Sequence, residues 1–158
     1  MTNTSEHSDQ SEKRGCILLV DDDDQVCQML SLALSTAGFD VVVAGTQQQA
    51  QHRLEHSRPD ALVLNLQRSE ADGLAILRGM RARQDLSHVP IVFLAGCASE
   101  DFRRRAICAG ADWFGLRPLG ILELKQRIRQ LIRDGRPPLE LFATGARRLG
   151  ARRLKPTG

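Results

Sequence analysis

The fold of this chain is decided by the stretch Cys16-Ile17-Leu18-Leu19-Val20-Asp21-Asp22-Asp23-Asp24. A short apolar run that ends in charged residues is typical of a strand buried on both faces of a parallel sheet. A second run of this kind, Ala61-Leu62-Val63-Leu64, ends at Asn65. Parallel strands bring their carboxyl ends to one edge of a sheet. We therefore expect the acidic cluster and Asn65 to border one crevice, which is the usual ligand site of open α/β sheets.

The rest of the body continues this alternation of strands and helices. Strands are predicted at residues 16–20, 40–44, 61–64, 91–94 and 112–116. Apolar residues at helical spacing fill the gaps and predict five helices. The first has an apolar stripe that includes Met29 and stops at Gly38, Asp72 caps the third, and the fourth runs from Ser99 to Gly110. Five strands alternating with five helices predict an α/β fold, a doubly wound five-stranded parallel sheet covered on both faces.

Length and charge divide the chain of 158 residues into one domain with two tails. Residues 1–14 are polar and are expected to be disordered, residues 15–133 form the domain, and residues 134–158 form a basic, flexible C-terminal tail. The net charge of +3 comes from this tail, which holds six basic and two acidic side chains. The tail repeats Gly-Ala-Arg-Arg-Leu at residues 145–149 and 150–154.

Cysteine usage and hydropathy indicate the compartment. The four cysteines show no metal-ligand spacing, and Cys16 and Cys27 fall in apolar segments, so buried free thiols are expected. No apolar run approaches the roughly 20 residues that span a bilayer. We therefore expect a cytoplasmic location without a membrane span.

Several motifs in this order resemble the receiver domain of bacterial two-component response regulators. They are the strand and acidic pair at residues 17–22, the strand that ends at Asn65 (residues 59–65), Asp72-Gly73, the strand at residues 89–94, Gly110-Ala111-Asp112 and Arg117-Pro118. The resemblance covers residues 15–133 and implies the flavodoxin-like (βα)5 fold. It also implies a domain that accepts a phosphoryl group from a histidine kinase on an aspartate, with magnesium held by an acidic pair.

Carried over by position, the resemblance assigns a role to seven residues. The phosphoacceptor falls on Asn65, the acidic pair on Asp21 and Asp22, the hydroxyl switch residue on Ala95, the aromatic switch residue on Phe114, and the lysine on Arg117, followed by Pro118. Asn65, Ala95 and Arg117 depart from the family pattern, so a degenerate receiver, or pseudo-receiver, is implied.

Each departure has a chemical consequence. A carboxylate oxygen is a competent nucleophile, whereas the Asn65 amide has no charge and its nitrogen lone pair is delocalised. Ala95 has no hydroxyl that could move towards a phosphoryl group. With one carboxylate fewer and a guanidinium nearby, magnesium binding at Asp21 and Asp22 is expected to be weak or lost. We also expect Arg117 to pair with Asp21 or Asp22, and Asp24 to cap the first helix.

The functional hypothesis is a non-enzymatic signalling module that works by protein–protein interaction. Its partner would be a histidine kinase or another regulator, and a homodimer would form through the face of the fourth helix, fifth strand and fifth helix. That region is rich in arginine, at 103–105, 127, 129 and 133, although a solvated helix face explains such runs equally well.

Two alternatives remain open. The first is a conventional phosphorelay receiver that uses another acceptor or carries an inactivating Asp-to-Asn change, natural or engineered. Ala95 and Arg117 argue against a single deliberate change. The second is a nucleic-acid or anionic-surface binder that acts through the basic tail.

Overall fold

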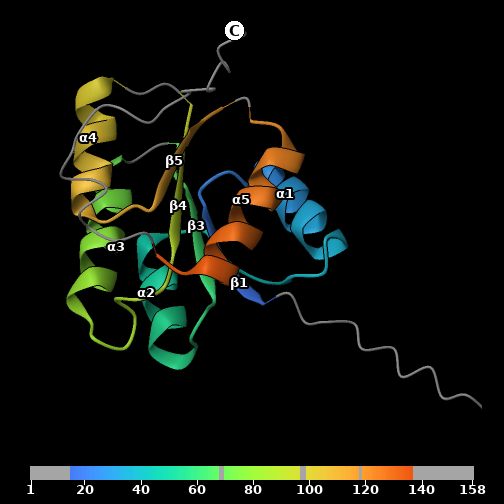
Figure 1. The fold of residues 1–158 in the computed structure, drawn as a ribbon, viewed down its shortest axis with the longest axis horizontal. Helices are drawn as coiled ribbons and strands as arrows, with labels where there is room; N and C mark the ends of the chain where they lie inside the picture. The colour runs from blue at the N-terminus through green and yellow to red at the C-terminus, as the bar shows by residue number, and fades with distance from the viewer. Residues whose placement is uncertain (1–14, 68–69, 97–98, 118, 137–158) are drawn as a thin grey trace, which may run out of the picture.

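A five-stranded parallel sheet forms the centre of the molecule (Figure 1). The computed structural model describes residues 15–67, 70–96, 99–117 and 119–136. The strand order is β2 (Asp40–Ala44), β1 (Cys16–Asp21), β3 (Ala61–Asn65), β4 (Ile91–Ala95) and β5 (Trp113–Leu116). This order confirms the predicted flavodoxin-like receiver fold, in which the direction of strand addition reverses once, after β2, and leaves a crevice at the carboxyl ends of β1 and β3.

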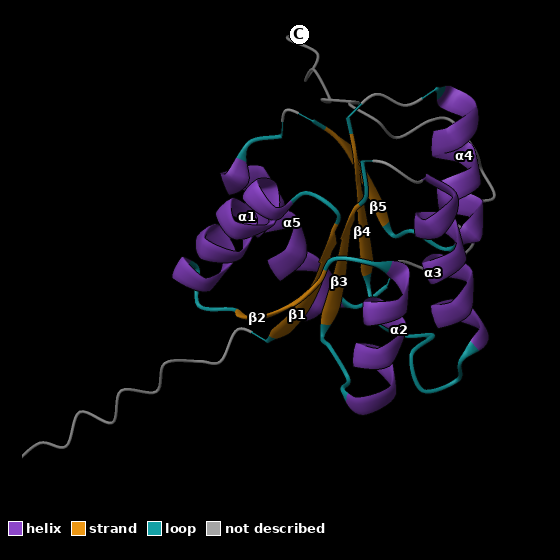
Figure 2. Cartoon of the chain, turned by 180° about the vertical axis from the view of Figure 1, so that it is seen from behind, coloured by secondary structure: helices purple, strands orange, loops and turns teal. Residues whose placement is uncertain are grey.

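Helices cover both faces of the sheet, as right-handed crossovers require. Figures 1 and 2 show α1 (Asp24–Thr36) and α5 (Ile121–Asp134) on one face. The opposite face is covered by α2 (Gln47–His56), α3 (Glu70–Ala82) and α4 (Glu100–Ala109). None of the helices within the described ranges is both long and apolar enough to cross a bilayer.

The strands are apolar throughout because each face of the sheet packs against helices. Ile17 and Leu19 of β1 join the core beneath α1 and α5, whereas Leu18 and Val20 join the core on the other side. In β5 the same alternation sends Trp113 and Phe114 to opposite cores, as the strand pattern predicts.

Three strands extend one residue beyond their predicted ends. β1, β3 and β4 finish at Asp21, Asn65 and Ala95, so the predicted site residues are the last residues of the strands themselves. The fifth strand begins at Trp113, one residue later than expected. Asp21, Asn65 and Ala95 are therefore held by the ladder of the sheet, whereas Asp22 and Arg117 directly follow strands β1 and β5.

The capping predictions are only partly confirmed. Ser99 caps α4, and Gly110 ends it with a left-handed φ of 115°. Asp24 is not the cap of α1: Asp23 has the extended backbone of a cap, and its carboxylate accepts from the amides of Gln25 and Val26. Asp72 is not a cap either, because α3 begins at Glu70.

A buried ionic network closes the amino edge of the sheet, opposite the crevice. The Asp112 side chain is fully buried and accepts from Arg81 Nη2 and from the Ile91 amide, each at 2.8 Å. Its other oxygen accepts from Arg136 Nε at 2.8 Å. Burial lowers the pKa of Arg81 to about 10, so Arg81 still carries its charge at neutral pH. The network ties α3, β4, β5 and the chain after α5 together.

Asp112→Asn should lower the free energy of unfolding by about 3 kcal/mol, since it leaves two arginines facing a neutral amide in a buried site. Asp134→Asn is the matched control, because the Arg133–Asp134 pair is exposed and screened by solvent, so its loss should leave the stability nearly unchanged. Urea unfolding followed by circular dichroism measures both. Equal stabilities of the two variants would contradict the structural role of the network.

Candidate functional site

The site is built on two residues that lie side by side at the ends of adjacent strands. Asp21 of β1 and Asn65 of β3 are partners in the parallel ladder. Asn65 Nδ2 donates to Asp21 Oδ2 at 2.8 Å. Asp21 is 1% exposed and Asn65 0% exposed, so this hydrogen bond is shielded from water. The structure thus brings together the two positions that the sequence placed at one crevice.

The rest of the acidic cluster organises the backbone around this pair. Asp21 Oδ1 accepts from the Asp23 amide at 2.9 Å, which turns the chain into α1. Asp22 Oδ1 accepts from the Gln67 amide at 2.9 Å and so holds the segment that follows β3. Both oxygens of Asp21 therefore already have donors.

Asp21 is a carboxyl group in an environment that disfavours its charge. Burial raises its pKa, and the nearby charges of Asp22 and Asp23 act in the same direction. The hydrogen bonds from the Asp23 amide and the Asn65 side chain lower the pKa but do not cancel the effect of burial. A second carboxylate at position 65 would add further repulsion.

The other side of the crevice is formed by β4 and β5. The Arg117 amide donates to the Ala95 carbonyl at 2.7 Å, which places the two predicted switch-region residues next to each other. Arg117 Nη2 lies against Gly96: a Cβ at that glycine would be 2.8 Å from the nitrogen. Pro118 lies outside the described residues.

The aromatic switch position points into the core. Phe114 is buried and stacks against Phe93, with ring centroids 5.8 Å apart. Phe102 of α4 meets both rings edge-on. Motion of Phe114 would therefore require this three-ring cluster to repack.

The predicted pairing of Arg117 with Asp21 or Asp22 is wrong. Within the described ranges Arg117 makes no ion pair, and its Nε is buried without a hydrogen-bond partner. The guanidinium extends over Gly96 instead, and the Asn65 amide takes the place beside Asp21. The neutral amide, not the cation, thus supplies the donor to the buried carboxylate.

A model of the response regulator receiver domain matches residues 17–129. The chain belongs to this family. It is 36% identical over 134 residues to the transcriptional regulatory protein TrcR of Mycobacterium tuberculosis. The aligned region covers 85% of this chain and 51% of that protein. It is 37% identical over 121 residues to the response regulator MprA of Mycobacterium leprae, and this aligned region covers 77% of the chain and 52% of that protein. The chain thus spans about half of the length of these curated relatives.

Solved receiver structures have the same fold. A putative response regulator from Chloroflexus aurantiacus superposes with a TM-score of 0.70 at 28% identity, and 75% of this chain and 98% of that chain are covered. The receiver domain of the sensor histidine kinase PA1611 from Pseudomonas aeruginosa gives a TM-score of 0.69 at 26% identity, with 75% and 98% covered. That kinase receiver domain has a magnesium ion coordinated in its active site cleft.

The residues of this receiver domain fit magnesium poorly. The ion takes several oxygen ligands in octahedral geometry. Here both oxygens of Asp21 accept hydrogen bonds, and Asn65 directs its nitrogen towards Asp21. Asn65 Oδ1 is buried without a partner among the described residues, which also contain no group of three His, Cys, Asp or Glu side chains arranged to hold a metal. Compared with a site that has a carboxylate at position 65, the carboxyl edge therefore offers one acidic oxygen ligand fewer to the ion.

Two arginines of the predicted interaction face are engaged inside the receiver domain. The Arg127 guanidinium lies over the Trp113 ring at 5.3 Å, and Arg129 donates to the Ala37 carbonyl at 3.4 Å. Exposed apolar side chains on this face come from Leu116 of β5 and Leu122 of α5. The face thus presents leucines where the sequence alone indicated only charge.

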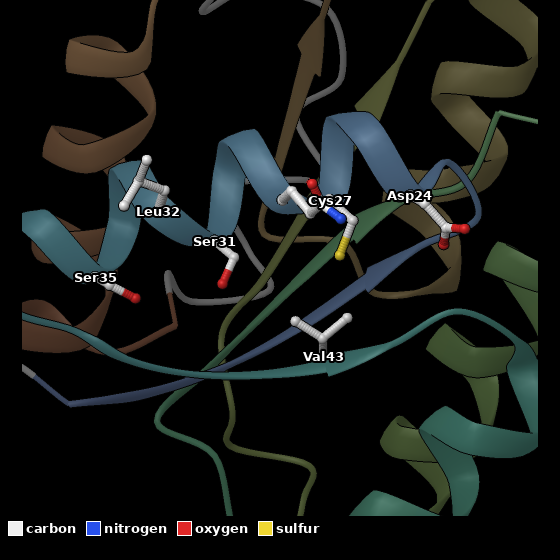
Figure 3. Close-up of a pocket in the computed structure, with 7 residues that line it drawn as sticks. Asp24, Cys27, Ser31, Leu32, Ser35 and Val43 are labelled. Atoms are coloured by element: carbon white, nitrogen blue, oxygen red, sulfur yellow. The ribbon is translucent and has the colours of Figure 1, made fainter.

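Sequence reasoning missed a second hollow, between α1 and β2 (Figure 3). It has a volume of about 530 Å³ and is lined by Cys27, Ser31, Leu32 and Val43, among others. Met29, predicted on the buried stripe of α1, is 60% exposed, and Leu32 is 71% exposed. Cys27 is buried as predicted, and burial raises the pKa of its thiol, which disfavours the reactive thiolate. Cys16 is only half-buried, and Cys97 lies outside the described residues.

Asp21→Asn should change the pH dependence of stability in a defined direction. Because the pKa of Asp21 is raised on folding, its contribution is most favourable below the unfolded pKa and is lost as pH rises through the folded pKa. The stability of wild type relative to Asp21→Asn should therefore fall as pH rises above the unfolded pKa of about 4, as measured by urea unfolding. Asp134→Asn is the control of opposite sign, because Arg133 lowers the pKa of Asp134. If wild type instead became more stable relative to Asp21→Asn as pH rises, the raised pKa of Asp21 would be contradicted.

Asn65→Asp should lower the free energy of unfolding by about 2 kcal/mol at neutral pH without magnesium, because it replaces a buried donor by a second carboxylate. Magnesium should restore part of the loss in this variant and have little effect on wild type. The double variant Asp21→Asn/Asn65→Asp exchanges donor and acceptor and should recover most of the stability. Urea unfolding with and without magnesium measures all three chains. Wild-type stability of Asn65→Asp without the ion would show that the amide hydrogen bond has no structural role.

Proposed function

We propose that this receiver domain transmits a signal without accepting a phosphoryl group at residue 65. The observation that carries the proposal is the buried amide of Asn65 at the end of β3, which donates to Asp21. An amide has no anionic oxygen to attack phosphorus, and its nitrogen is committed to the neighbouring carboxylate. The covalent mark of a conventional receiver therefore has no acceptor at this position.

The neighbouring positions support the same proposal. Ala95 ends β4 with a methyl group in place of a hydroxyl, and Arg117 extends over Gly96 rather than towards Asp21. Phe114 is packed in a three-ring cluster. We propose that the conformation of the domain is set by its sequence or by a non-covalent input, and that magnesium binds weakly.

The output in this proposal is protein–protein interaction, and the domain performs no enzymatic step of its own. Receiver domains generally have a histidine kinase as partner, and the curated relatives include proteins named transcriptional regulators. Leu116 of β5 and Leu122 of α5 are exposed and offer apolar contact area for a regulator or a second copy. We place the partner surface here.

The proposal is tested by incubating the chain with acetyl phosphate and magnesium and measuring the intact mass. Wild type should gain no phosphoryl group, because no carboxylate stands at the end of β3. Asn65→Asp is the matched variant, which should gain one group if the rest of the site is still competent. Peptide mapping locates any group that is found.

A stable phosphoryl group on wild type would overturn the proposal and favour a conventional receiver with another acceptor. Calorimetric titration with magnesium gives an independent measurement. Wild type should bind the ion at least tenfold more weakly than Asn65→Asp, because the variant regains a charged oxygen ligand. Equal affinities would show that the missing carboxylate does not limit magnesium binding.

A further inference from the structure

A hollow of about 360 Å³ opens between the segment after β3 and the ends of β4 and β5. Its volume lies within the range of small-molecule sites. The hollow exists because the end of β4 contributes almost no side chain: Ala95 has one methyl group, and Gly96 has none. Leu66, Phe93 and Phe102 form the rest of its apolar wall, and Gln67 and Arg117 add the polar part of the lining.

Arg117 is the one charged side chain among the described residues that line this hollow. Its Nε is buried and without a partner within the described ranges, and its Nη2 lies against Gly96 at the rim. The residue as a whole is half-buried, but an Nε shielded from water without a partner is unfavourable, and planar bidentate anions match the geometry of a guanidinium group best. The hollow therefore offers a binding position for one anionic group, which would pair with Arg117.

The surroundings restrict which anion fits. Asp21 and Asp22 lie on the other side of the crevice and disfavour a dianion such as phosphate more than a single negative charge. A small hydrated ion would also leave the wall formed by Leu66, Phe93 and Phe102 in contact with water. A single carboxylate attached to an apolar body satisfies both parts of the hollow.

We propose that this hollow binds a small monocarboxylic acid with an apolar body, non-covalently, with its carboxylate on Arg117. The inference deepens the proposed function, because it names a non-covalent input to the same crevice. Binding itself does not depend on the proposed function; only the signalling effect of binding rests on it. Phe93 and Phe102 line the hollow and also pack against Phe114. A bound ligand would therefore bias the ring cluster that holds the switch position.

The test is a calorimetric titration of the full chain, without phosphodonor, using three probes. Benzoate carries both features, benzamide has the same body without the charge, and inorganic phosphate has charge without the body. Benzoate should bind at least tenfold more tightly than either of the others. In a two-dimensional amide NMR spectrum it should shift the signals of Gly96, Phe102 and Phe114.

Two variants assign the binding to this hollow. Arg117→Met keeps the length of the side chain and should weaken benzoate binding at least tenfold, since a charged hydrogen bond is lost. Ala95→Val fills the hollow and should have a similar effect while leaving the charge in place. Arg104→Met, on the exposed side of α4, removes the same charge elsewhere and should bind benzoate like wild type. Melting curves establish that each variant is folded.

Three results would each overturn the inference: no saturable binding of benzoate by wild type, binding that survives Arg117→Met, or phosphate binding as tight as that of benzoate. These failures are separate from failure of the proposed function. A phosphoryl group gained from acetyl phosphate would refute the proposed function. It would not change the benzoate titration, which contains no phosphodonor.

Discussion

The hydrogen bond from Asn65 to Asp21 determines how the carboxyl edge of this sheet is held together. Parallel pairing places the two side chains side by side, and neither is accessible to solvent. Two carboxylates in such positions require a cation or a proton between them. An amide has nearly the shape of a carboxylate but supplies a donor, so it meets Asp21 with a hydrogen bond where a second carboxylate would repel it. The turn into α1 and the segment after β3 depend on this arrangement, because Asp21 and Asp22 accept their backbone amides.

Once Asn65 satisfies Asp21, the crevice divides into two halves with different electrostatic requirements. The half at β1 and β3 has a donor for each oxygen of Asp21. The half at β4 and β5 holds Arg117, which has no anionic partner within the described part of the chain. In a site with a carboxylate at position 65, the second negative charge would attract the Arg117 guanidinium across the crevice. The amide removes that attraction, and Arg117 lies along the small residues at the end of β4 instead.

The sequence was sufficient to predict the strands and the shared crevice of Asp21 and Asn65, because buried parallel strands carry a strong local pattern. The flavodoxin-like arrangement of the strands was implied only by the resemblance to receiver domains. Side-chain partners were harder to predict. The direction taken by Arg117 depends on torsions and on the space above Gly96, which no pattern encodes. The network of Arg81, Asp112 and Arg136 joins residues far apart in the chain and has no local signal. Met29 was misplaced because the apolar stripe of α1 is wider than the face that β1 and β2 cover.

The two edges of the sheet explain how the receiver fold persists with an altered site. The amino edge is held by a buried carboxylate with three donors, and the two cores fill the faces between sheet and helices. Arg117 takes part in none of these. Asn65 lies at the end of β3, where its amide bonds to Asp21, and Ala95 adds only a methyl group to one core at the end of β4. Substitution at residue 65 changes charge and donor arrangement without opening a core, so its cost is limited to the buried hydrogen bond and to repulsion with Asp21. A neutral amide at residue 65 is therefore compatible with the receiver fold, because both cores and the amino edge are built from other residues.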